Sequence, residues 1–375
     1  MGTYHSRRTK PMPSILSVGT CNPEYPLLQN ETVEFAKELF EDHFSNIDRL
    51  LRVFQNGQIE TRYFANGMQW YKEEHSLQER NDKYIEKSVE YGVEAIRQCV
   101  TNDHYLQRPI PINDIDAILF ISSTGLATPS IEARIMNILP FNPHTKRIPI
   151  WGLGCAGGAA GLSRAYEHCL AYPSSKVLVL CVELCSLTFQ KNDISKSNLI
   201  GTSLFADGVS CALMVGDEIR RSQYSSQSAS PKIRATQSTL MPDSEDVMGW
   251  DVKDNGLYVV FSKDIPNIVS SWLQPNLVKF LLDQDVSLDQ IHHYIAHPGG
   301  LKVLNAYAQA LSISNKMFED SMHVLRDFGN MSSATVLYVL ERFMNKTIEE
   351  GELGILLALG PGFSSEILLL EWSSD

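Results

Sequence analysis

The chain has 375 residues, enough for two domains or for one duplicated unit with a large core. Its content of 43% hydrophobic and 20% charged residues is ordinary for a soluble globular protein, which excludes the disordered and fibrous classes. The net charge of -12 argues against a general nucleic-acid-binding surface, although local basic clusters can still hold an anionic ligand.

Membrane insertion and secretion are also excluded by the sequence pattern. No apolar run approaches the roughly 18 residues that a membrane helix needs, and the polar, basic start is unlike a secretory signal. We expect residues 1–13 to be a disordered arm or the remnant of a tag. The seven cysteines form no Cys-x-x-Cys pair, so we expect reduced thiols and a cytoplasmic location.

The first half of the chain predicts alternating helices and strands. Ser76 and Glu79 form a capping box, and apolar residues recur behind them at helical spacing as far as Val100. The further predicted elements are a strand over 116–122, a short strand before 152, a helix of small residues that continues to 170, and two apolar strands over 176–185 and 209–215.

The second half repeats this order of elements. Residues 218–232 are polar, serine-rich and interrupted by proline, which is typical of a linker. The elements predicted beyond it are a helix over 266–282, a strand from 291 to 297, a helix opened by small residues over 329–340, and strands over 353–359 and 365–372. The sequence therefore predicts a duplicated α/β unit with halves at 14–217 and 233–375.

One cysteine stands among small residues in the segment WGLGCAGGAA, residues 151–160. Gly152, Gly154 and Gly157 match a dinucleotide-binding fingerprint, but Glu183 lies further along than the roughly 20-residue offset which that fingerprint requires. The start of a helix would also stabilise a thiolate, and small neighbours would let a carbonyl group approach Cys155. Taken alone, Cys155 still fits a small core residue better than a nucleophile.

Two residues of the second half favour the nucleophile. His297 ends an apolar strand before Pro-Gly-Gly, so its ring can project past the carboxyl edge of the sheet, where α/β proteins place their chemistry. His293 and His297 have the spacing of a metal pair on a helix, but their neighbours favour a strand, and we expect no metal. Asn330 begins a small-residue helix, where it is either an N-cap or an amide donor to a developing enolate.

Five segments together resemble the signatures of the type III polyketide synthases, the chalcone synthase-like family. They lie at 154–158, 203–208, 296–300, 329–334 and 360–362. The resemblance extends from Ser14 to Trp372 and is strongest toward the bacterial members that make alkylpyrones. It implies a five-layered αβαβα thiolase-like fold of two duplicated halves, a homodimer, and no cofactor beyond the CoA thioesters that serve as substrates.

The resemblance also implies a mechanism. Cys155 would attack a long-chain fatty acyl-CoA, with His297 helping to keep its sulfur as the thiolate. Malonyl-CoA would then lose carbon dioxide, and His297 with Asn330 would bind the oxygen of the resulting enolate. The enolate would attack the acyl-enzyme, and after further extension ring closure would release an alkylpyrone.

Further residues match the family's pocket and its CoA contacts. Phe205 matches the gatekeeper aromatic, and Thr128 matches a loop that reaches into the partner subunit. The other expected pocket residues are Thr188, Trp250, Val259 and Ser332. Trp250 is larger and Val259 smaller than the residues of plant members, which favours an aliphatic tunnel. The expected CoA contacts are Arg49, Arg52, Gly299, Gly300 and Lys302, whereas Asn56 replaces a third basic residue of the plant enzymes.

Three alternatives stay open at this point. A ketoacyl synthase that extends chains on a carrier protein uses cysteine, histidine and asparagine on the same fold. A non-catalytic thiolase-fold binding or scaffold protein would be expected to have lost one of the three residues. A dinucleotide-binding module would have to bind NAD(P).

Overall fold

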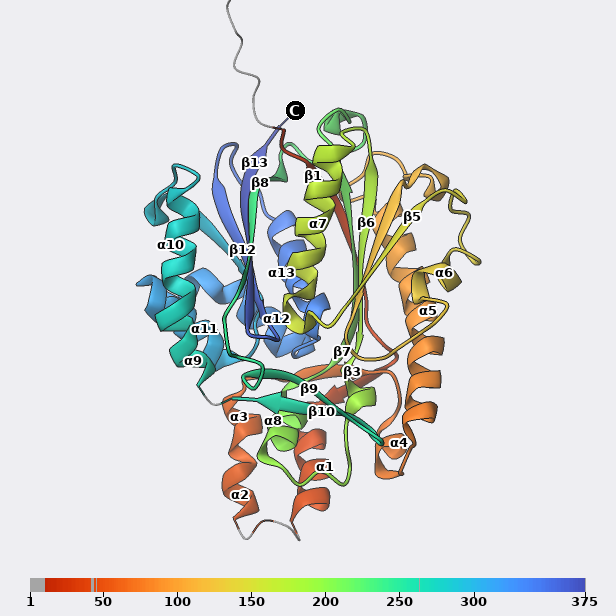
Figure 1. The fold of residues 1–375 in the computed structure, drawn as a ribbon, viewed down its shortest axis with the longest axis vertical. Coiled ribbons are helices and arrows are strands. Elements are labelled where there is room, and N and C mark those ends of the chain that lie inside the picture. Colours follow the sequence, from red (N-terminus) through yellow and green to blue (C-terminus); the bar gives the residue numbers. More distant parts are fainter. Residues whose placement is uncertain (1–10, 42–43, 45, 263, 375) are drawn as a thin grey trace, which may run out of the picture.

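The computed structural model describes residues 11–41, 44, 46–262 and 264–374. Within these residues nine strands form one mixed sheet, which Figure 1 shows as two layers with a pair of helices between them. In sheet order the strands are β11 (Ile291–Ala296), β12 (Leu353–Gly360), β13 (Ser364–Ser373), β8 (Ser230–Leu240), β1 (Ser14–Cys21), β7 (Asp207–Val215), β6 (Lys176–Leu184), β4 (Ala117–Ser122) and β5 (Lys146–Trp151).

Four strands of each half share one topology, and β5, at the edge beyond β4, has no counterpart among the described strands of the second half. In the first half β4 pairs with β6 in parallel, and β7 pairs antiparallel with both β6 and β1. In the second half β11 pairs with β12 in parallel, and β13 pairs antiparallel with both β12 and β8. The two parts are joined where Ser14 of β1 pairs with Lys232 of β8. The order and direction of the strands thus confirm the duplication, which residue identity between the halves is too weak to prove.

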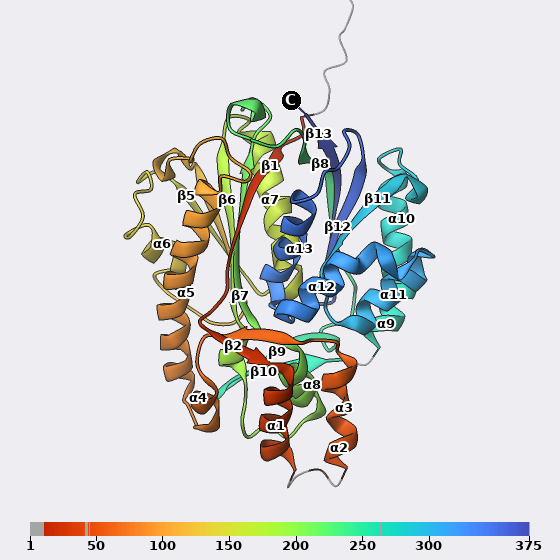
Figure 2. The ribbon, with the colours of Figure 1, turned by 180° about the vertical axis from the view of Figure 1, so that it is seen from behind.

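Five layers follow from this arrangement. The central layer holds α7 (Gly157–Ala171) and α13 (Thr335–Met344), which lie between the two sheets in both views (Figures 1 and 2). The outer helices are α5 (Leu77–Thr101) and α6 (Ile131–Ile135) on one side, and α9 (Ile265–Ile268), α10 (Gln274–Leu282) and α11 (Leu301–Leu311) on the other. The predicted αβαβα architecture is confirmed.

The central helices pack closely because α7 begins with small residues. A Cβ atom at Gly158 would collide with the carbonyl oxygen of Ser333, just ahead of α13. A side chain at this position would therefore push the two central helices apart, so glycine is required where their amino ends approach each other.

Short elements outside the layers gather at one end of the molecule (Figure 2). They are β2 (Tyr25–Leu28), α1 (Gln29–Phe40), α2 (Ile47–Leu50), α3 (Arg52–Asn56), β3 (Thr61–Phe64), α4 (Met68–Lys72), α8 (Lys196–Leu204), β9 (Met248–Lys253) and β10 (Gly256–Phe261), with α12 (Glu319–Phe328) beside α13. The sequence analysis assigned no element to most of this region.

Two predicted boundaries can be compared with the coordinates. The predicted arm lies largely outside the described residues, which begin at Pro11. The predicted linker, 218–232, contains one 3-10 turn, and its last three residues already belong to β8, because Ser230 and Pro231 pair with the end of β13. In the part of the chain that the structure describes, no helix has the length and apolar character needed to cross a membrane.

Candidate active site

Cys155 lies where β5 leads into the central helix α7. Gly152 and Gly154 have positive φ angles of 91° and 46°, which glycine adopts at little cost. A Cβ atom at Gly154 would also lie 2.8 Å from Cδ of Pro361. Cys155 then occupies the 3-10 turn η2 (Gly154–Ala156), two residues ahead of α7, and is buried. The predicted position of Cys155 at the start of a buried helix of small residues is confirmed.

Asn330 lies directly beside the sulfur. The Sγ of Cys155 is 3.9 Å from Oδ1 of Asn330, and the same oxygen accepts a hydrogen bond from the backbone N–H of Ser332 at 2.9 Å. Nδ2 of Asn330 donates to the carbonyl oxygen of Gly299 at 3.3 Å. These contacts fix the amide with its oxygen toward the cysteine, and one N–H of Nδ2 is left for another acceptor.

His297 directly follows strand β11, as the sequence predicts, and its ring is buried. Its backbone carbonyl accepts from the N–H of Gly299, the residue that also accepts from Asn330, so one turn connects the two side chains. Neither ring nitrogen of His297 has a hydrogen-bond partner among the described residues. Buried ring nitrogens are normally paired, which marks this imidazole as a group available to a bound molecule.

The protonation states of the cysteine and the histidine are set by burial. Desolvation raises the pKa of the Cys155 thiol to about 12, and contacts with Ser332 and Asn330 offset only part of this. Desolvation lowers the pKa of His297 to about 3. Burial thus favours a thiol and a neutral imidazole, and it acts against the helix terminus, which favours the thiolate. That His297 helps to keep the sulfur as the thiolate stays a prediction.

A buried carboxylate organises the surroundings of this site. Glu183 on β6 is fully buried, and one of its oxygens accepts from the N–H of Ser123 at 3.0 Å and from the hydroxyl of Thr124 at 3.1 Å. Its other oxygen accepts from the hydroxyl of Ser333 at 2.6 Å. The hydroxyl of Ser123 in turn accepts from the N–H of Gly154 at 3.0 Å. Glu183 thereby connects the end of β4, the cysteine turn and the start of α13.

Glu183 was missed as a site residue by the sequence analysis, which weighed it only as part of a dinucleotide fingerprint. The available signal was a single carboxylate near the end of an otherwise apolar strand. Burial raises the pKa of Glu183 to about 7, and its hydrogen bonds act in the opposite direction.

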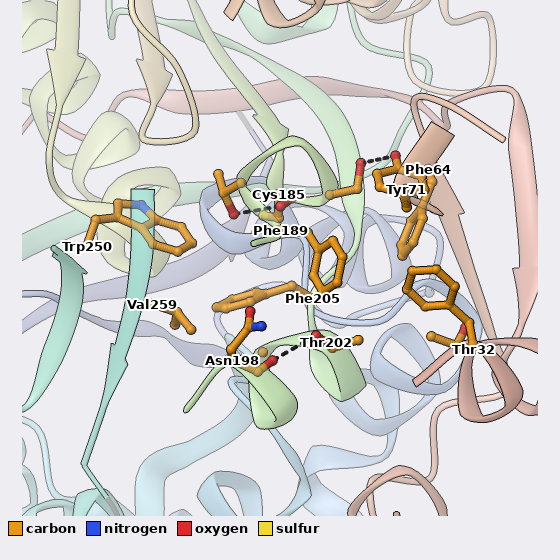
Figure 3. A pocket seen from close by; sticks show the side chains of 14 residues that line it. Thr32, Phe64, Tyr71, Cys185, Phe189, Asn198, Thr202, Phe205, Trp250 and Val259 are labelled. Carbon is orange, nitrogen blue, oxygen red and sulfur yellow. Dashed lines mark hydrogen bonds between the residues drawn. The ribbon is translucent and has the colours of Figure 1, made fainter. Parts of the chain in front are cut away.

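A largely apolar cavity of about 50 Å³ lies beside the predicted gatekeeper (Figure 3). Four of the expected pocket residues line it: Phe205, Thr188, Trp250 and Val259. The ring of Phe205 stacks on Phe261 with centroids 5.5 Å apart and lies 6.0 Å from Trp250. Figure 3 shows Trp250 and Val259 on one side of Phe205, and Phe64 and Tyr71 on the other.

Further cavity residues come from elements that the sequence analysis did not connect with the site. They are Phe35 from α1, Phe64 from β3, Tyr71 from α4, and Cys185 and Phe189 from the segment after β6. The rings of Phe35 and Phe189 are in contact, with centroids 5.7 Å apart.

Two expected pocket residues lie elsewhere. Ser332 is in the turn beside Cys155 and Asn330, where its φ of 48° directs its backbone N–H to the asparagine. Thr128 is exposed in the loop that precedes α6. Neither Ser332 and Thr128 nor the three predicted catalytic residues line the cavity. The backbone connects the catalytic residues to the cavity wall, because Asn330 exchanges two 2.9 Å hydrogen bonds with Leu204 and Ala206, the neighbours of the gatekeeper in the sequence.

The predicted CoA contacts lie on several elements. Arg49 and Arg52 are exposed on α2 and α3, two short helices separated at Leu51. The other three positions are Gly299 and Gly300, in the turn after β11, and Lys302, which is exposed at the start of α11.

The two histidines that had the spacing of a metal pair have different environments. Nε2 of His293, in β11, is 2.9 Å from a carboxylate oxygen of Glu352, whereas the ring nitrogens of His297, which follows β11, have no partner among the described residues. Among the described residues no three histidine, cysteine, aspartate or glutamate side chains gather as a metal centre requires.

Comparison with known proteins places this geometry in a family. The family models for the N-terminal and C-terminal domains of chalcone and stilbene synthases match residues 3–218 and 232–373. A protein provisionally named chalcone synthase from Bacillus subtilis (strain 168) is 51% identical over 362 residues, covering 96% of this chain and 99% of that protein. A 1,3,6,8-tetrahydroxynaphthalene synthase from Streptomyces peucetius subsp. caesius is 33% identical over 360 residues, covering 96% and 93%.

A solved structure agrees with these matches. The 1,3,6,8-tetrahydroxynaphthalene synthase of Streptomyces coelicolor A3(2), described as a bacterial type III polyketide synthase, is 28% identical to this chain. The two structures superimpose with a TM-score of 0.88, covering 96% of this chain and all of that one.

Proposed function

This chain belongs to the chalcone and stilbene synthases, the type III polyketide synthase family of acyltransferases, and on that premise we propose that it condenses a long-chain fatty acyl-CoA with malonyl-CoA to give alkylpyrones. The observation that carries the proposal is the contact between Cys155 and Asn330, together with a buried His297 whose ring nitrogens have no partner among the described residues. All three residues are present, whereas a non-catalytic scaffold protein would be expected to have lost one of them. Family membership leaves the carrier-protein synthase and the dinucleotide module without support.

The first step is loading of the starter. The sulfur of Cys155 attacks the thioester carbonyl and passes its proton to the neutral imidazole of His297. The carbon–sulfur bond to CoA then breaks, and CoA leaves as a thiol with the proton from His297.

The second step is decarboxylation of malonyl-CoA. The bond to the carboxylate breaks, and its electron pair moves to the thioester oxygen as an enolate. The remaining N–H of Asn330 and the N–H of neutral His297 can donate to this oxygen without removing a proton from the substrate. An apolar face such as the ring of Phe205 favours neutral carbon dioxide over the malonyl carboxylate. The enolate carbon then attacks the acyl group, and Cys155 leaves as the thiolate.

The apolar wall of the cavity supports an aliphatic starter. At about 50 Å³ the cavity is smaller than the ~150 Å³ that admits benzene in an engineered apolar cavity. A long acyl chain must therefore displace part of the wall. We propose that Phe35 and Phe189 move aside, since the two rings are in contact and both belong to the wall of the cavity.

Binding of CoA and dimer formation belong to the same proposal. Arg49, Arg52 and Lys302 are exposed cations that suit phosphate groups, and the turn of Gly299 and Gly300 adds backbone donors. No other cofactor takes part in these steps, and we expect a cytoplasmic enzyme.

The homodimer would place the Thr128 loop against the partner subunit. Two apolar side chains next to this loop support the idea, because Leu126 is 54% exposed and Trp151, which donates to the carbonyl of Gly125, is 50% exposed.

The test is incubation with malonyl-CoA and a series of starters from acetyl-CoA to long-chain acyl-CoA, with products identified by mass spectrometry. We expect pyrones from the wild-type protein and none from Cys155→Ala. Cys169→Ala is the matched control, because Cys169 is a buried thiol in the last turns of α7 and should leave the products unchanged. If no starter yields pyrones that disappear in Cys155→Ala, the proposal is refuted.

A further inference from the structure

We propose that Arg62 is a positioning residue for the decarboxylation step, holding the gatekeeper Phe205 and the turn that carries Asn330 in one fixed arrangement. The inference rests on the proposed function, because it concerns the two groups assigned to malonyl-CoA. It assigns a role to a charged side chain that the steps above do not use.

Arg62 is a fully buried guanidinium in strand β3. Its Nη1 donates to two carbonyl oxygens, those of Thr202 and Phe205, each at 2.7 Å. Its Nε and Nη2 have no hydrogen-bond partner in the described part of the chain. Burying a charged group with unused donors disfavours folding, so the contacts that Arg62 does make point to a role beyond packing.

Asp207, two residues after the gatekeeper in the sequence, supplies the opposite charge. It is fully buried, and its attraction raises the pKa of Arg62 against the lowering by burial. The Asp207 carboxylate accepts hydrogen bonds from the N–H of Ala65 at 2.7 Å and from the N–H and hydroxyl of Ser186, both at 2.6 Å. Arg62 and Asp207 therefore tie the backbone around Phe205 to β3 and to the wall of the cavity.

The aliphatic stem of Arg62 braces the turn that carries Asn330. A Cβ atom at Gly329 would lie 2.8 Å from Cγ and 2.9 Å from Cδ of Arg62, so the backbone of Gly329 rests on the stem. Gly329 has a φ of 73°, which a residue with a side chain rarely adopts. The next residue, Asn330, then exchanges its two backbone hydrogen bonds with Leu204 and Ala206.

One side chain therefore contacts both parts that act on malonyl-CoA. Cys155 is held differently, through the glycine turn after β5 and the hydrogen bond between Gly154 and Ser123. A change at Arg62 should therefore displace Phe205 and Asn330 and leave the nucleophile in place. Decarboxylation would fall, whereas loading of the starter would continue.

The test uses Arg62→Lys, which keeps a positive charge for Asp207 but loses the planar fork that reaches two carbonyl groups. Conversion of malonyl-CoA to acetyl-CoA and carbon dioxide is measured beside acylation of Cys155 by a starter alone, which is followed by protein mass. We expect kcat for decarboxylation to fall by roughly 10- to 100-fold, as for a misplaced reacting group. Acylation should stay within about two-fold, a split that a general loss of folding would not produce.

Arg221→Lys is the matched control, because Arg221 is also buried but donates to the carbonyl oxygens of Gln227 and Ser228 in the linker. It should change neither rate. Should Arg62→Lys fail to fold, the double variant Arg62→Met with Asp207→Asn removes both buried charges and is measured in the same way. An equal loss of both rates in a folded variant, or unchanged decarboxylation, overturns the inference.

The wild-type protein separates the two proposals. If it does not decarboxylate malonyl-CoA, the proposed function fails, and the role of Arg62 fails with it. If it does so while the folded Arg62 variants decarboxylate at the wild-type rate, only the role of Arg62 is refuted.

Discussion

Replacing Glu183 by glutamine tests how much the buried charge of this carboxylate lowers the free energy of unfolding. The amide has nearly the same shape as the carboxylate and no charge. Its oxygen can keep the hydrogen bonds from Ser123 and Thr124, and its NH₂ group can donate to the hydroxyl of Ser333, which is able to accept. The substitution therefore removes the charge at Glu183 with little change in packing.

The sign of the effect follows from the pKa. Burial raises the pKa of Glu183 from 4.5 to about 7, so the folded chain keeps a proton that the unfolded chain releases. The stability that the wild type gains from protonated Glu183 is therefore lost progressively as the pH rises from about 4.5 to about 7, and it stays lost above that range. At about 1.4 kcal/mol for each pKa unit, the full loss is about 3 kcal/mol.

The assay is urea unfolding of the wild-type and Glu183→Gln proteins at pH 5 and pH 8. The free energy of unfolding of the variant, minus that of the wild type, should increase by roughly 2 to 3 kcal/mol from pH 5 to pH 8. Groups common to both proteins cancel in the comparison. Glu167→Gln, which changes a half-exposed carboxylate on α7, should show no such gain. An equal difference between wild type and Glu183→Gln at both pH values would refute the reasoning.

Three further predictions concern the site and the central helices. Asn330→Ala should abolish release of carbon dioxide from malonyl-CoA while protein mass still detects the acyl-enzyme; an equal loss of both would contradict its assignment. Phe189→Ala should shift starter preference toward longer acyl-CoAs in a competition assay, and unchanged product lengths would count against its closing role. Gly158→Ala should destabilise the fold by roughly 1 to 3 kcal/mol in thermal unfolding, because its Cβ collides with Ser333. Gly249→Ala, whose Cβ meets nothing within 4 Å, is its control.

The layered fold could be predicted because each apolar strand and small-residue helix has a strong local pattern. His297 at the end of β11 and Cys155 ahead of α7 followed from chain order alone. The region of α1 to α4 could not be predicted in the same way. Most of its elements have only four or five residues, too few for an apolar period to emerge.

The parts of the site that the sequence did not show depend on contacts between distant segments. Phe35, Phe64 and Tyr71 reach the cavity because α1, β3 and α4 meet there, and no motif connects these residues. The donors to Glu183 likewise come from β4 and from the turn before α13. The burial of Cys155 could not be predicted either, because a sequence shows that Cys155 precedes a helix but not how far water is excluded from it.

The duplication explains why the nucleophile and its neighbour meet. Cys155 precedes α7 and Asn330 precedes α13, which are equivalent helices of the two halves, and their amino ends touch where Gly158 approaches Ser333. The positive ends of both helices therefore lie close to the turns that carry Cys155 and Asn330, while burial and the charge of Glu183 oppose a resting anion. Such a site favours negative charge most where a reaction creates it next to both helix ends. The oxygen of an enolate or of a tetrahedral intermediate satisfies that condition better than the sulfur of an unreacted cysteine.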